Sequence, residues 1–346
     1  MSRRVQQDPC FEPCLELLRL PLEQPVAASA IDQLLRQDPD HLVGFLTRHR
    51  IDQLVYRLML ERLAPSDWPE ALRESLQWAQ RRTAVAVLYQ IEAAKQAAEA
   101  LDGAEIPYVF FKGFHLGEAL YGDAVLRPAS DVDLLVAEGD LQRAIEALGP
   151  SGFARVEQAG QPSYEAALDG HGSQLDVHAH LFHPRRCRQS LTHWILAHRQ
   201  ERNGLWFPNE AAALLIMLLN PALTDHVTLQ LIHAVDLDRW LRHLQSAAPT
   251  VDPQATVAVL EDSGVATAAW TMLDWTRSLL STPLPPGFEA AVAPGPLRRA
   301  YLRQWLRRDP ARLYAYWPLL VRGGFSLVMQ DRLGDALRAV FGAEAG

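Results

Sequence analysis

Lysine is almost absent from this chain, and cysteine is scarce. Lys95 and Lys112 are the only lysines among the 33 lysines and arginines. This scarcity gives modest support to a functional role for Lys112, which lies beside a chemical motif. The three cysteines, Cys10, Cys14 and Cys187, are too few for a disulfide framework and favour a reduced, cytoplasmic protein. Cys10 and Cys14 have no matching Cys/His pair nearby in the sequence, which therefore predicts no zinc site there.

The chain also lacks long hydrophobic runs and an excess of positive charge. The longest apolar run, residues 211–219, is too short to cross a bilayer, and no apolar segment follows Met1 as it would in a signal peptide. The 33 basic residues against 41 acidic ones leave a net charge of −8, which argues against a long nucleic-acid groove. A small-molecule or peptide partner fits this balance better than a nucleic acid or a membrane.

What is present suffices for a substantial core. An apolar content of 49% and a charged content of 21% over 346 residues are typical of soluble globular proteins. Apolar residues at helical spacing predict helices over residues 31–35, 42–63 and 70–101. Helical spacing returns after residue 188, over residues 210–219, 225–245, 253–260, 266–280 and 297–341.

In the centre of the chain, apolar and polar residues alternate as they do in β-strands. Strands are expected at residues 106–111, 131–136, 153–156, 163–168 and 173–181, with a helix at 140–148. A helix between the first two strands and hairpins afterwards imply a small mixed sheet and an α+β fold. We therefore divide the chain into an N-terminal helical region (1–101), a core (102–187) and a C-terminal helical domain (188–346).

The segment from residue 108 to Phe114 has the form of a phosphate-binding turn. Residues 108–111 read as a strand, Lys112-Gly113 as a turn, and a short helix opens near Phe114. Glycine lets the backbone approach an anion closely, and the first N–H groups of a helix have no internal partners. Lys112 is either a phosphate contact or a surface lysine at a strand end.

Two acids occupy one face of the next predicted strand. In residues 131–136, Asp131 and Asp133 point to one side, while the alternate residues are apolar and face the core. Two carboxylates so close together are costly unless a cation holds them, and hard oxygen ligands suit Mg²⁺ or Mn²⁺. The alternative is a strand edge that carries two solvated acids.

A third acid follows on a later strand. Asp176, His178 and His180 share one face of the strand predicted at residues 173–181, so Asp176 is available to complete a metal site. The same three residues are also a nominal zinc-hydrolase ligand set. Under that alternative, however, Asp131 and Asp133 would have no role.

Together these motifs resemble the nucleotidyltransferase fold of the DNA polymerase beta superfamily. The motif FKG…ALYGD…LRPASDVDLLV, followed by LDVHAHL, is similar to the sequences of bacterial nucleotidyltransferase-family proteins of mostly unassigned substrate. The resemblance covers residues 85–185. The usual Gly-Ser or Gly-Gly pair is replaced here by Lys112-Gly113-Phe114, with a longer gap to Asp131. Without a serine hydroxyl, the triphosphate must be bound by backbone N–H groups and Lys112.

The resemblance implies a metal-dependent transfer of a nucleoside monophosphate from an NTP to a hydroxyl or phosphate acceptor, with release of pyrophosphate. Asp131, Asp133 and Asp176 would hold Mg²⁺ or Mn²⁺, and Gly113 with the helix start at Phe114 would bind the phosphates. The acceptor would be a small molecule, a peptide or a protein.

Further candidates surround these motifs. Arg127 would neutralise the leaving pyrophosphate, or is an ordinary salt-bridged arginine, and Ser130 would bond a phosphate or cap a turn. His178, His226 and Asp236 are candidate acceptor-site residues, with a scaffold role as the alternative for the last two. A catalytically inactive nucleotide- or partner-binding protein of the same fold also fits the sequence.

Overall fold

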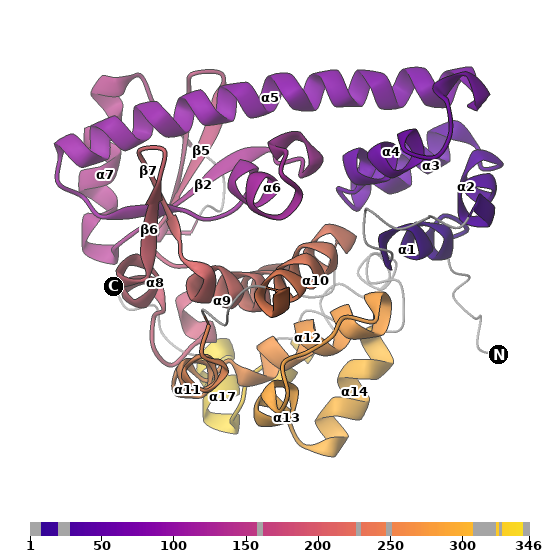
Figure 1. The fold of residues 1–346 in the computed structure, drawn as a ribbon. Helices are drawn as coiled ribbons and strands as arrows, with labels where there is room; N and C mark the ends of the chain where they lie inside the picture. Colours follow the sequence, from indigo (N-terminus) through magenta and orange to yellow (C-terminus); the bar gives the residue numbers. More distant parts are fainter. Residues whose placement is uncertain are drawn as a thin grey trace.

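A five-stranded sheet carries the acidic residues of the central motifs (Figure 1). The computed structural model describes residues 8–19, 28–157, 162–225, 230–246, 251–306, 323–324 and 327–341. The strands are β1 (Tyr108–Phe110), β2 (Asp131–Val136), β3 (Ala154–Val156), β4 (Glu165–Gly170) and β5 (Ser173–His178). Their spatial order is β1-β2-β5-β4-β3, with β2 and β5 parallel and the other pairs antiparallel. The predicted α+β fold with a small mixed sheet is confirmed.

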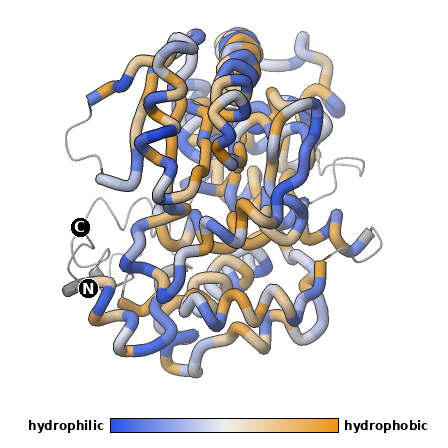
Figure 2. The backbone as a smooth tube through the Cα atoms, turned by 90° about the vertical axis from the view of Figure 1, so that its left-hand side faces the viewer, coloured by the Kyte–Doolittle hydropathy of each residue, from blue (hydrophilic) through white to orange (hydrophobic). Residues whose placement is uncertain are grey.

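The two faces of the sheet bury different sets of side chains. Val132, Leu134 and Val136 of β2 pack with apolar residues of the long helix α5 (Glu70–Gly103) and of α7 (Leu141–Leu148). Leu135, on the opposite face with Asp131, belongs to the core shared with the C-terminal helices. Figure 2 shows that hydrophobic and hydrophilic residues alternate along the helices that cover the sheet. The strand is therefore central, and its acids face the C-terminal half.

Helix α5 joins the N-terminal helices to the sheet. Figure 1 shows it running from α1 (Phe11–Arg19), α2 (Ala28–Leu35), α3 (Pro39–Arg48) and α4 (Asp52–Leu60) across to β2, β5 and α7. Helix α5 therefore contacts both parts across the predicted boundary at residues 101 and 102. This boundary and the one at residues 187 and 188 stay predictions.

The single helix predicted over residues 42–63 is wrong, because α3 ends at Arg48 and α4 begins at Asp52. Arg50 takes a left-handed φ of 53°, and two hydrogen bonds close the helix end: Arg50 N–H to the Thr47 carbonyl and Ile51 N–H to the Leu46 carbonyl, both 3.0–3.1 Å. This is a Schellman helix end, with arginine where glycine is usual. Apolar spacing continues through the break and therefore hid it.

The C-terminal part contains a hairpin that the helical spacing missed. After α8 (Thr192–Ala197), β6 (Arg199–Arg202) and β7 (Leu205–Pro208) pair around Asn203-Gly204, whose φ values of 54° and 77° fit a type I′ turn. Strand β7 packs against β1, and Phe207 stacks on His115 of α6 (Phe114–Tyr121) with ring centroids 4.1 Å apart. The hairpin thus packs against β1 and α6, the two elements on either side of Gly113.

The remaining helices lie in segments that were predicted to be helical, except the short helix at residues 288–292, which was not predicted. They are α9 (Glu210–Asn220), α10 (Leu231–Ser246), α11 (Pro253–Ser263), α12 (Ala266–Leu280), α13 (Phe288–Val292), α14 (Pro296–Leu306) and α17 (Leu333–Phe341). Across the part of the chain that the structure describes, none of the helices combines the length and apolarity needed to traverse a bilayer.

The buried ring of His115 makes stability depend on pH. Burial, aided by the positive charges of Arg202 and Arg127, lowers the pKa of His115 from 6.5 to about 3. Below pH 6.5 the unfolded chain therefore binds a proton that the folded chain excludes, so stability falls as pH falls through this window. Between pH 7 and 5.5 we expect the wild type to lose about 1 kcal/mol more unfolding free energy than His115→Phe, which keeps the stacking on Phe207. Urea denaturation at both pH values measures this, and equal losses would contradict it.

Candidate active site

The pairing of β2 with β5 brings the three predicted acids together. In this parallel register Asp133 lies opposite Asp176, and Asp131 lies opposite Gln174. Burial raises the pKa of Asp176, and the carboxylates of Asp131 and Asp133 raise it further, against a hydrogen bond from Gln174. The three acids therefore form one electrostatically coupled cluster.

Each of these carboxylates uses one oxygen in a side-chain hydrogen bond and leaves the other without one in the described residues. Asp131 Oδ2 accepts from Ser130 at 3.0 Å, and Asp176 Oδ1 accepts from Gln174 at 2.7 Å. Asp133 Oδ1 accepts from Lys112 Nζ at 3.0 Å. One oxygen on each acid is thus open to a further ligand.

Asp133 lies beside two side chains that favour its ionised form, Lys112 and His178. Burial opposes its ionisation, but Lys112 and then His178 outweigh burial and hold the pKa of Asp133 well below its usual range. The His178 ring lies 3.2 Å from Asp133 and 3.3 Å from Glu165, without the alignment of hydrogen bonds. These two carboxylates raise the pKa of His178 to about 9 although burial lowers it.

The predicted turn between β1 and α6 is present. Gly113 is the residue before α6, and its φ of 60° with ψ of −132° is a conformation that only glycine adopts readily. A Cβ atom here would meet Ala129 at an ordinary 3.4 Å, so the backbone angle is what requires glycine. Phe114, the first helical residue, is buried, and only its backbone can face a ligand.

Arg127 and Asp236 form a buried ion pair. Arg127 Nε donates to Asp236 Oδ2 at 2.7 Å, and the Tyr121 hydroxyl donates to Oδ1 of the same carboxylate at 2.7 Å. The two charged side chains are 6% and 2% exposed. Asp236 of α10 therefore positions the loop that leads into β2, and its proposed contact with an acceptor stays a prediction.

Two other predicted residues lie apart from this cluster or outside the described chain. His180 is buried and contacts Ser190 at 3.2 Å and Glu138 at 3.5 Å. His226 lies outside the described residues.

Neither predicted set of metal ligands converges tightly in the described residues. Within the described ranges, the ligand atoms of Asp8, Cys10 and His41 all lie within 4.8 Å of one another. Neither the three acids nor the set Asp176, His178 and His180 converges as closely. Zinc needs closely converging ligands, whereas Mg²⁺ keeps several waters and shares carboxylates with substrate phosphates. The Asp8 carboxylate already accepts a hydrogen bond from the Cys10 amide and contacts His41 at 3.2 Å.

A cavity of about 410 Å³ opens beside Asp131 and Asp133, whereas Asp176 is not among the residues that line it. Predicted residues that line it are Lys112, Gly113, Arg127, Asp131 and Asp133. Sequence reasoning missed the other residues that line it. They come from the α3–α4 turn, the loop before β2, the end of α9 with the segment after it, and the start of α10 with the residue before it: Arg48, His49, Arg50, Ala129, Asn220, Thr224, Gln230 and His233. No local motif marks these residues, because only the packing of distant helices brings them here.

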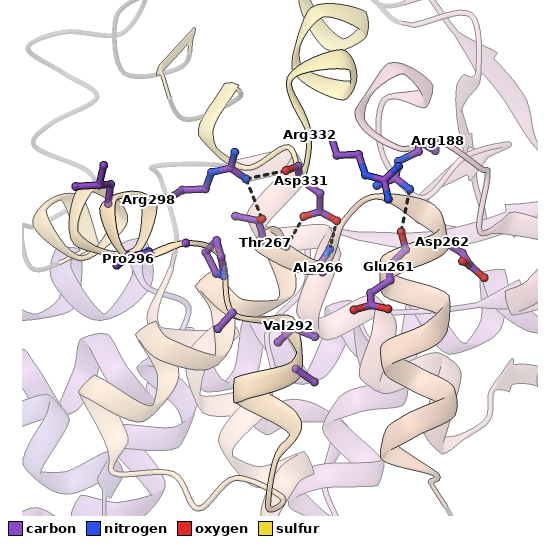
Figure 3. Close-up of a pocket in the computed structure, with 15 residues that line it drawn as sticks. Arg188, Glu261, Asp262, Ala266, Thr267, Val292, Pro296, Arg298, Asp331 and Arg332 are labelled. Carbon is purple, nitrogen blue, oxygen red and sulfur yellow. Dashed lines mark hydrogen bonds between the residues drawn. The ribbon is translucent and has the colours of Figure 1, made fainter.

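A larger cavity of about 750 Å³ lies between α11, α12 and the segment before α17 (Figure 3). Its charged groups are largely engaged within the protein: Asp331 accepts from the Ala266 and Thr267 amides, and Arg298 donates to the Asp331 carbonyl. The smaller cavity, which Asp131 and Asp133 line, is therefore the better candidate for a ligand site.

A mixed sheet flanked by helices, with paired acids beside a glycine turn, is the arrangement of a nucleotidyltransferase. Residues 36–281 match the family described as uncharacterised nucleotidyltransferases, and this chain belongs to that family. The comparison with curated proteins gives no match. The family assignment supports a nucleotidyltransferase-type activity and an NTP substrate.

The Arg127–Asp236 pair leads to a stability prediction. Asp236→Ala leaves a buried guanidinium without its partner, which should cost about 3–5 kcal/mol of unfolding free energy. The double variant Arg127→Met, Asp236→Leu removes both charges and should cost clearly less. Urea denaturation of the two variants measures this difference. A double variant as unstable as Asp236→Ala would contradict the assignment.

Proposed function

We propose that this protein transfers a nucleoside monophosphate from an NTP to a hydroxyl or phosphate acceptor, with release of pyrophosphate. The observation that carries the proposal is the set of three coupled carboxylates, each with an open oxygen, beside the Gly113 turn. Family membership supports the reaction class.

Asp131, Asp133 and Asp176 would hold Mg²⁺ or Mn²⁺, since their open oxygens supply hard ligands. When bound, the metal would lower the pKa of the acceptor hydroxyl and offset the charge of the pyrophosphate. Lys112 contacts one oxygen of Asp133, so its ammonium lies where it can also reach a phosphate. Positioning and charge neutralisation then account for most of the catalysis.

The glycine turn would hold the triphosphate through backbone N–H groups at the start of α6. Arg127 lines the same cavity and adds positive charge near the leaving group, while Asp236 keeps its guanidinium in place. Ser130 orients Asp131.

His178 lies between Asp133 and Glu165, and this position supports our proposal that an acceptor approaches beside it. His226 and Asp236 complete our proposed acceptor region. The acceptor would be a small molecule, a peptide or a protein. The three cysteines are free and buried, which fits our proposal that the protein works in the reducing cytoplasm.

One observation favours a second candidate, a nucleotide- or partner-binding protein without turnover. Lys112 and His178 both contact the same oxygen of Asp133 and so satisfy much of its charge without a metal. Absence of Mg²⁺-dependent pyrophosphate release with each of the four NTPs and every plausible acceptor would favour this candidate.

Removal of single acids tests the proposal. Asp131→Asn, Asp133→Asn and Asp176→Asn should each lower Mg²⁺-dependent pyrophosphate release by more than about a hundredfold, because loss of a metal's outer partners alone costs 10- to 100-fold. The matched control is Asp169→Asn, an exposed acid on the neighbouring strand β4, which should retain activity. Thermal melting checks that each variant is folded. Activity in a folded Asp133→Asn variant at the wild-type level would rule out the proposed site.

A further inference from the structure

We propose that Arg48, the last residue of α3, and Arg50, in the turn before α4, bind the triphosphate of the nucleotide. This inference rests on the proposed function and extends it, because it makes the N-terminal helices part of the nucleotide site. Both arginines line the cavity that also contains Gly113, Asp131 and Asp133.

The cavity lining is positive although the whole chain is negative. Arg48, Arg50, Lys112 and Arg127 give four positive charges, and two aspartates give two negative ones, so the lining carries +2 with neutral histidines. The chain as a whole carries −8. A local excess of positive charge in an acidic protein indicates a site for an anion.

Two of these four cations are engaged and two are not. Lys112 pairs with Asp133, and Arg127 pairs with Asp236. Among the residues for which the structure gives contacts, Arg48 and Arg50 form no ion pair and no side-chain hydrogen bond. Their guanidinium groups are therefore available to a ligand, and guanidinium matches phosphate oxygens in a two-point geometry.

The turn that carries them is fixed in place. Arg50 adopts its left-handed φ of 53° in a helix end closed by two backbone hydrogen bonds. His49 then holds the start of α10: its carbonyl accepts from Ile232 N–H at 3.2 Å, and its Nδ1 accepts from Leu231 N–H at 3.4 Å. Contacts on both sides of the turn thus set where the two arginines enter the cavity.

The same cavity restricts the class of anion. Asp131 and Asp133 would repel a bare anion, so an anion bound here must arrive with a cation that neutralises them. A metal-bound polyphosphate meets this condition, because its phosphates offer several oxygens to arginine and its metal binds the carboxylates. The family match begins at residue 36 and so includes the α3–α4 turn.

Arg50→Gly separates ligand binding from folding. Glycine adopts a left-handed φ at lower cost than arginine, so this variant should melt at the same or a higher temperature than the wild type. It should nevertheless bind inorganic tripolyphosphate with Mg²⁺ at least about tenfold more weakly, since it loses a charged hydrogen-bond donor. Arg48→Gln should weaken binding in the same direction. Isothermal titration calorimetry measures both affinities.

Two controls match these changes. Glu105→Gly makes the same backbone change at another left-handed helix end, φ 54°, away from the cavity. Arg36→Gln removes one exposed positive charge from the same helical region without touching the cavity. Both should bind tripolyphosphate as the wild type does.

The outcomes distinguish this inference from the proposed function. Wild-type affinity in folded Arg50→Gly and Arg48→Gln, or no tripolyphosphate binding by the wild type, overturns the arginine site even if nucleotidyl transfer is observed. Arginine-dependent binding without pyrophosphate release from any NTP, when small-molecule, peptide and protein acceptors are supplied, supports the arginine site and overturns the catalytic proposal.

Discussion

The parallel pairing of β2 with β5 is the constraint on which the rest of this site depends. It sets Asp133 beside Asp176, and the alternation along β2 adds Asp131 to the same face. The register is held by the opposite face, where Val132, Leu134 and the apolar residues of β5 are buried. A slip of one residue would move the acids into that apolar layer, so packing on one face fixes the chemistry on the other.

Elements far apart in the sequence then balance the charge of this acidic face. Lys112 comes from the turn after β1, and Arg127 comes from the loop before β2, where Asp236 of α10 holds it. The α3–α4 turn is bound to the start of α10 through His49. Helix α10 therefore links the loop before the paired acids to the N-terminal helices, and the cavity exists only when all three parts are assembled.

Local patterns were sufficient to predict the sheet, the glycine turn and the acidic face. Strand alternation marks Asp131 and Asp133, and Gly113 stands between a strand and a helix. The β6–β7 hairpin was missed although Asn203-Gly204 is a strong signal for a type I′ turn. The break at Arg50 was missed because arginine replaces the glycine expected there. The cavity contacts of Arg48 and Arg50 could not be predicted, because they arise from packing between helices distant in the sequence.

The central claim is that the three acids bind a divalent cation together with a nucleotide. The most direct measurement is anomalous diffraction from crystals grown with Mn²⁺ and a non-hydrolysable NTP analogue. Our account predicts a manganese peak bound by oxygens of Asp131, Asp133 and Asp176 and by the phosphates. Nucleotide density without manganese at these carboxylates, with Asp133 still engaged by Lys112 and His178 alone, would contradict it.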